Sequence, residues 1–202
     1  MEIKNPGRKF SFLNDPGSVR KYYHKSLITL STSNLFSEED AIDELAIVGQ
    51  LWVNIRVFEL TLRSFINNSI LLHHKDALWW RNESIIKRRH LNVFQRAKNA
   101  QGFTFSSLVL LFSKSYKKLW HEVLENSLIP SSTISRSQFH SNLEYIRKFR
   151  NIIAHHEPLN AKNVLRALEY MVEVLDSIDP IAAEWLVQSK NQMTKDLNTL
   201  HR

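Results

Sequence analysis

An arginine and two histidines stand close together in the segment Arg150–Pro158, which reads Arg-Asn-Ile-Ile-Ala-His-His-Glu-Pro. The guanidinium of Arg150 is always charged and can hold a phosphate through two parallel hydrogen bonds. The imidazoles of His155 and His156 can exchange a proton near neutral pH. An arginine and a histidine beside one phosphodiester are enough to cleave RNA without a metal ion. This segment is therefore the candidate site.

The spacing of Arg150 and His155 sets a geometric condition for a shared site. On an ideal helix, side chains five positions apart are separated by about 140° of arc, so a straight helix would not place both on one stripe. Pro158 disfavours helical geometry at the residue before it, so the helix is expected to end near His155 or His156. The long arginine side chain could then meet the histidine in one groove. The alternative is that a histidine only caps the helix C-terminus, where cationic side chains are favourable.

The same segment resembles a known ribonuclease motif. Its Arg-x4-His spacing resembles the R-x4-6-H motif of HEPN ribonucleases. The full nine-residue sequence of the segment resembles the Abi-like (abortive infection) branch of that superfamily. The resemblance covers residues 40–160 of the sequence. Departures from the family pattern leave the arginine and the histidine intact. The other similar segments are Phe58–Ile66, Trp79–Trp80, Gly102–Phe105 and Leu108–Trp120, and the departures are Ser64, Thr104 and Ile152.

The resemblance implies an all-α, HEPN-like bundle of long helices that acts on RNA as a metal-independent endoribonuclease. Cleavage would use the RNA 2′-hydroxyl as nucleophile, with His155 as general base or acid and Arg150 holding the phosphate. The resemblance also implies a toxin-like role in antiphage (abortive infection) defence, and a homodimer that apposes two motifs. Supporting roles at the site fall to Asn151, His156, Glu157, Glu59 and Arg63.

Two other interpretations fit the same residues. The first is a noncatalytic HEPN-type module that binds a small non-coding RNA or a protein partner in the same groove, and only a cleavage assay separates it from an enzyme. The second and weaker one is a purely structural helical scaffold. Glu59 and Arg63 share this ambiguity. Spaced i, i+4, they either form an ordinary helix-face ion pair or orient Arg150 or a histidine.

An excess of positive charge favours a polyanionic partner. The formal net charge is +7 and the pI is near 9.7, which points to nucleic acid first. Two basic clusters could contact RNA, and aromatic residues within the first could stack on bases. Either cluster could instead be a solvated face. The candidate RNA-binding residues are Arg81, Lys87, Arg88, Arg89, Arg96 and Lys98, the aromatics are Trp79, Trp80 and Phe94, and the second cluster is Lys114, Lys117 and Lys118.

Metal, disulfide and membrane chemistry are not indicated by the sequence. The pairs His73–His74 and His155–His156 lack the spacing of a helical H-E-x-x-H zinc site, so we expect no metal and no other cofactor. The sequence has no cysteine, which excludes disulfides and fits a reducing, cytoplasmic compartment. The longest apolar stretch, Phe103–Phe112, is too short to span a bilayer. The N-terminal residues are polar and basic, so we expect no secretory signal there. We therefore expect no membrane partner.

The elements that must position the candidate residues are predicted to be helices. Residues 1–36 contain two Pro-Gly pairs and are expected to form an irregular arm with a short helix, followed by one HEPN-like helical domain over 37–202. Apolar periodicity in this domain predicts a long helix over 37–70, bent or divided at Gly49, and a helix over 108–124 capped by Ser106 or Ser107. Further helices are expected over 139–155 and 164–178. Asp179-Pro180 is expected to open the last helix.

Overall fold

A computed structural model of the chain describes residues 38–97, 102–155, 157 and 159–200, with side chains between 46 and 195. Every regular element in these ranges is a helix, which confirms the predicted all-α class. The predicted N-terminal arm, residues 1–36, lies outside the described residues. The chain divides into two units, Met1–Ala46 and Ile47–Arg202. Apart from the first turns of one helix, every regular element of the described residues belongs to the second unit.

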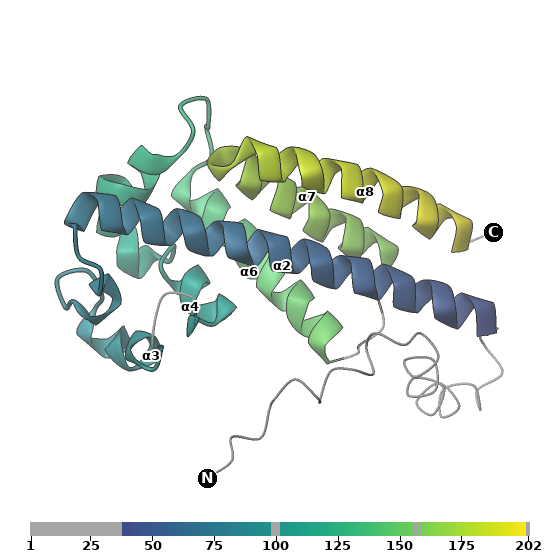
Figure 1. The fold of residues 1–202 in the computed structure, drawn as a ribbon, viewed down its shortest axis with the longest axis horizontal. Helices are drawn as coiled ribbons and strands as arrows, with labels where there is room; N and C mark the ends of the chain where they lie inside the picture. The colour runs from purple at the N-terminus through teal and green to yellow at the C-terminus, as the bar shows by residue number, and fades with distance from the viewer. Residues whose placement is uncertain (1–37, 98–101, 156, 158, 201–202) are drawn as a thin grey trace, which may run out of the picture. The chain divides into compact units, whose positions relative to one another are not determined.

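Four long helices make up most of the described chain, and a series of short helical elements lies between the first of them and the second. Helices α6, α7 and α8 follow one another along the chain, α7 packs against both of the others, and α4 packs against α6 (Figure 1). The elements in order are α2 (Glu38–His74), η3 (Trp79–Arg81), η4 (Arg88–His90), α3 (Leu91–Gln95), α4 (Phe105–Leu110), η6 (Lys114–Tyr116), α5 (Lys117–Leu119), η7 (Trp120–Leu124), η8 (Glu125–Ser127), α6 (Arg136–Ala154), α7 (Ala161–Ile178) and α8 (Pro180–Leu200).

Helix α2 is one continuous helix of 37 residues, and Gly49 does not divide it. Apolar residues recur at steps of three and four, which places them on one face of the helix. The helix ends at His74 because Lys75 adopts a left-handed backbone with a φ of 53°, and its N–H bonds the carbonyl of Leu71 at 2.8 Å. The buried face consists of Leu51, Ile55, Phe58, Leu62, Ile66 and Ile70.

The single helix predicted over 108–124 is wrong in its extent. Helix α4 is capped instead by Thr104, whose side chain accepts the N–H of Ser107 at 3.2 Å. Helical geometry then stops at Ser113, whose backbone is extended with a ψ of 165°. Serine competes with helical hydrogen bonding and favours helix starts over interiors. The rest of the segment continues as short turns, including a π-helical stretch over Trp120–Leu124.

The three C-terminal helices begin close to the predicted positions, and α6 and α7 also end close to theirs. The cap of α6 is Ser135, and the helix stops at Ala154 with His155 as its C-cap, as predicted. The N-cap of α7 is Asn160, whose side chain accepts the N–H of Lys162. Asp179 opens α8 by accepting the N–H of Ala182 at 3.1 Å, which confirms its predicted capping role.

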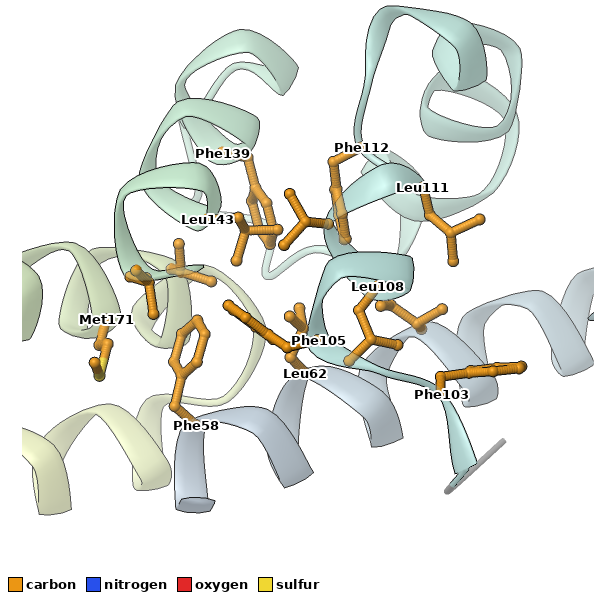
Figure 2. Close-up of a cluster of buried hydrophobic side chains, with 14 of the residues drawn as sticks. Phe58, Leu62, Phe103, Phe105, Leu108, Leu111, Phe112, Phe139, Leu143 and Met171 are labelled. Atoms are coloured by element: carbon orange, nitrogen blue, oxygen red, sulfur yellow. The ribbon is translucent and has the colours of Figure 1, made fainter. Parts of the chain in front are cut away.

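The core between α2, α4 and α6 fixes the surroundings of the candidate site. Phe58 and Leu62 on α2 meet Phe105 on α4 and Leu143 on α6 (Figure 2). The rings of Phe58 and Phe105 meet edge to face, with centroids 6.1 Å apart. Each such buried side chain stabilises the fold by about 1.5–3 kcal/mol. The described helices include none long and apolar enough to cross a membrane.

Candidate active site

Three chemistry-bearing side chains share one stripe of α2. Glu59 follows Trp52 by seven positions, and Arg63 follows Glu59 by four. At 3.6 residues per turn these intervals leave all three within about 40° of arc. The buried apolar face of the helix packs into the core. This stripe therefore has a fixed direction relative to α6.

Glu59 is held in place by a buried partner. Its Oε2 lies 3.4 Å from Nη2 of Arg63, and the two side chains are only 11% and 7% exposed. Arg63 also donates from Nη1 to the carbonyl oxygen of Phe103, which ties the pair to the segment that leads into α4. Removing one partner of such a pair leaves an uncompensated buried charge and costs about 3–5 kcal/mol. The Glu59–Arg63 pair is thus a buried ion pair and not an exposed helix-face one.

Arg150 reaches from α6 to this stripe and meets two of its members. Its Nε lies 3.8 Å from Oε1 of Glu59, and its Cζ lies 5.6 Å from the centre of the Trp52 ring. The Arg150 side chain keeps 38% of its surface exposed. Its terminal amino groups find no hydrogen-bond partner among the described residues. Trp52, Glu59, Arg63 and Arg150, called here the Arg150 cluster, therefore present a guanidinium to solvent.

Trp52 is a site residue that the sequence analysis missed. It lies within the range 40–160 covered by the resemblance but outside each of the segments that carry the HEPN pattern, and nothing local distinguishes it from an ordinary core tryptophan. The available signal was its spacing of seven positions from Glu59, which puts both on one side of a helix. Its exposure of 36% shows that it belongs to the rim of the site and not to the core.

His155 stands where α6 ends. Its backbone N–H bonds the carbonyl of Asn151 at 2.9 Å, and the N–H of Glu157 bonds the carbonyl of Ile152 at 3.0 Å. The His155 side chain is exposed, Asn151 is half-buried and Glu157 is exposed. His156 lies outside the described residues. The end of the helix thus leaves one imidazole free to meet a ligand.

The structure does not bring every predicted supporting residue together. Among the described residues, no hydrogen bond or ion pair joins the side chain of His155 to Arg150, Glu59 or Glu157. The predicted role of Glu157 in orienting a histidine stays a prediction. Within the same ranges, no group of three histidine, cysteine or carboxylate side chains is arranged to hold a metal ion. The described site therefore offers one partly exposed guanidinium and one exposed imidazole.

Comparison of the sequence with known protein families shows to which family the chain belongs. A family model described as Swt1-like HEPN matches residues 53–179, which is more than half of the chain and includes Glu59, Arg150 and His155. The chain belongs to the Swt1-like HEPN family. No curated protein and no solved structure matches it. The HEPN superfamily predicted from Arg150–Pro158 is confirmed, while the Abi-like branch stays a prediction.

The HEPN domain joins two basic segments that are far apart in the sequence. Arg89 of η4 donates to the hydroxyl of Ser115 in η6 at 2.6 Å, and Nδ1 of His90 lies 3.0 Å from the Tyr116 hydroxyl. The cationic side chains on both segments are exposed. We call this set the basic surface. It consists of Lys87, Arg88, Arg89, Lys114, Lys117 and Lys118.

The junction beneath the basic surface is uncharged near neutral pH. Burial lowers the pKa of His90 below its ordinary value, and the nearby charges of Arg89 and Lys87 lower that pKa further. Burial also raises the pKa of the Tyr116 hydroxyl. At neutral pH His90 is therefore uncharged while the neighbouring lysines and arginines are charged, and its contact with Tyr116 is an ordinary hydrogen bond.

The aromatic residues between the basic positions do not serve as a stacking platform. Trp79, Trp80 and Phe94 are 1%, 5% and 0% exposed and pack with Phe103. The prediction that they could stack on bases is therefore wrong, because their apolar area is used in the core of the HEPN domain. Among the other candidate RNA-binding residues, Arg81 and Arg96 are exposed, and Lys98 lies outside the described residues.

Proposed function

We propose that this HEPN domain is a metal-independent endoribonuclease. HEPN domains are in general ribonuclease or RNA-related modules. The observation that carries the proposal is the placement of Arg150. Glu59 and Trp52 hold its guanidinium at the surface, and its terminal amino groups are available to a phosphate. An exposed His155 at the end of the same helix supplies a proton-transfer group.

The proposed reaction is a transesterification within the RNA. A base removes the proton of the 2′-hydroxyl, and the oxygen attacks the adjacent phosphorus. The bond from phosphorus to the 5′-oxygen then breaks, and an acid protonates the leaving oxygen. The products are a 2′,3′-cyclic phosphate and a 5′-hydroxyl. His155 takes one of the two proton transfers, and Arg150 stabilises the negative charge that grows on the phosphate oxygens. Asn151 and His156 are proposed to help position these groups.

A second proton-transfer group would come from a second copy of the chain. HEPN domains generally dimerise, and a two-fold interface places the same surface of both subunits face to face. Such a dimer would line one cleft with Arg150 and His155 from each chain. Light scattering at micromolar concentration should then give twice the 23.7 kDa chain mass. A monomer that still cleaves RNA would refute the composite site.

In the cell we propose a cytoplasmic, toxin-like effector of the Abi-like kind that acts in antiphage defence. The chemistry of the Arg150 cluster is not specific for one RNA, and phosphate contacts carry no sequence information. A noncatalytic module that binds a small non-coding RNA or a protein partner is the alternative. It uses the same exposed guanidinium without proton transfer.

The experiment that tests the enzyme is incubation of the purified chain with total RNA in EDTA, followed by mapping of the new ends. We expect cleavage to persist in the chelator, because the described site supplies acid–base and anion-binding groups and no carboxylate cluster. The new ends should be 2′,3′-cyclic phosphate and 5′-hydroxyl. Loss of cleavage in EDTA with recovery in magnesium or manganese would contradict the mechanism. RNA that is bound but uncut would favour the noncatalytic alternative.

A further inference from the structure

We propose that Trp52 is a positioning residue that holds the Arg150 guanidinium for a phosphate, an inference that rests on the proposed function. Trp52 is on α2 and Arg150 is near the end of α6. The two are 98 positions apart in the sequence, as 150 minus 52. Their contact is therefore made only by the fold. Trp52 also precedes the range 53–179 matched by the family model.

The other contacts of Arg150 are too weak to fix its side chain alone. The 3.8 Å separation of its Nε from Glu59 Oε1 is beyond hydrogen-bonding distance, so this contact is an ion pair without a fixed angle. The Nε atom is itself buried without a hydrogen-bond partner. Leaving a buried donor unpaired is unfavourable. The other described contact of the guanidinium is with the Trp52 ring, whose centre lies 5.6 Å from Cζ.

The geometry of the Trp52 contact suits phosphate binding. An aromatic face attracts a guanidinium placed within about 6 Å of its centre, and the distance here is 5.6 Å. An arginine that stacks on an aromatic ring presents the flat face of its guanidinium to that ring. The N–H donors lie in its plane, so they stay available for the two parallel hydrogen bonds that a phosphate accepts. Glu59 approaches only the Nε side. The terminal amino groups have no described partner and remain available to a phosphate.

The partly exposed position of Trp52 is consistent with this role. Its 36% exposure puts it among the large apolar side chains that the fold leaves at the surface. Trp185 on α8 is similar in this respect, with 39% exposure, but no ring or ion-pair contact joins it to the described part of the Arg150 cluster. The two tryptophans thus form a matched pair for an experiment. One contacts the guanidinium and the other does not.

The test is a double-mutant cycle read by binding to a 2′-O-methyl RNA oligonucleotide, which lacks the nucleophilic hydroxyl and cannot be cleaved. The proteins are the wild type, Trp52→Leu, Arg150→Ala, the double variant, Trp52→Phe and the control Trp185→Leu. We expect Trp52→Leu to lower affinity about 3- to 10-fold, as loss of a cation–π contact predicts. The same change should have no effect when Arg150 is already alanine. Trp52→Phe should keep most of the affinity, and Trp185→Leu all of it.

Several outcomes would overturn the proposal. An equal loss from Trp52→Leu with and without Arg150 would mean that the tryptophan acts independently of the guanidinium. A loss in Trp185→Leu as large as in Trp52→Leu would mean a general surface effect. Failure of the proposed function has a different signature, because ordinary RNA would then stay uncut while the binding cycle is unchanged.

A second measurement needs no RNA. In the free protein, the indole ring current should shift the NMR signals of the Arg150 side chain upfield. Trp52→Leu should abolish this shift, and Trp52→Phe should keep part of it. An unshifted Arg150 in the wild type would overturn the proposal whatever the oligonucleotide does. A melting temperature for each variant identifies any that fails to fold.

Discussion

The variant His155→Ala should lose about 10²–10⁴-fold in RNA cleavage rate, the usual cost of removing a general acid or base. Initial rates on one labelled RNA measure this loss. Arg150→Ala should also abolish cleavage, because it removes the group that binds the phosphate. The two variants should differ in their affinity for RNA. His155→Ala is expected to keep its affinity for an uncleavable oligonucleotide, while Arg150→Ala is not.

The substitution His155→Ala should leave the fold unchanged. The His155 side chain is exposed and makes no described side-chain contact, and its capping hydrogen bond to Asn151 comes from the backbone, which alanine retains. Exposed substitutions of this kind usually change stability by about 0.5 kcal/mol or less. His121→Ala is the control, since His121 is also exposed and pairs only with Glu125 in the described structure. Wild-type cleavage by His155→Ala would refute the catalytic assignment.

The sequence was a good guide where a structure is decided by neighbouring residues. The end of α6 at His155 follows from the proline at 158, because a proline disfavours helical geometry in the residue before it. The start of α8 follows from an aspartate that accepts the N–H of Ala182. Both signals act within a few positions. They place His155 at a helix terminus without any knowledge of the rest of the fold.

Burial and long-range contacts were beyond the reach of the sequence. Trp79 and Trp80 sit among arginines, yet the fold turns both into the core against Phe103. The end of helical geometry at Ser113 could not be predicted, because the apolar periodicity of the sequence continues through this position. The contact of Trp52 with Arg150 depends on how α2 packs against α6. Such packing is set by side chains throughout the core and has no local signature.

The joined basic segments show what the fold adds to the charge pattern. From sequence alone, there are two separate basic runs, Lys87–His90 and Lys114–Lys118. Each of them could be an ordinary solvent-exposed surface that binds nothing. The hydrogen bonds from Arg89 to Ser115 and between His90 and Tyr116 bring them together. The two contacts bring exposed cations of both segments near one another, and a polyanion bound there would relieve their mutual repulsion. Among them, only Lys118 has a described carboxylate partner, an exposed Glu122 at 3.8 Å, and such a pair is worth little.

Charge reversal on the basic surface should therefore weaken RNA binding about 10- to 100-fold at low salt, as loss of two phosphate contacts predicts. The variants are Arg88→Glu with Arg89→Glu and, separately, Lys117→Glu with Lys118→Glu. Both should also lower the slope of log affinity against log salt by about 2. Because the fold joins the two segments, we expect similar effects from both pairs.

The control for this experiment is Lys190→Glu with Lys195→Glu on α8, which changes the net charge of the chain by the same amount. These lysines lie on a helix outside the basic surface, and Lys190 already pairs with Glu169 at 3.2 Å. If RNA senses only total charge, all three double variants will weaken binding equally, and the basic surface is then no more than a solvated face. If RNA lies across it, the control will stay near wild type. The second pair of variants matters because Arg89→Glu also removes the hydrogen bond to Ser115, whereas Lys117 and Lys118 take no part in that junction.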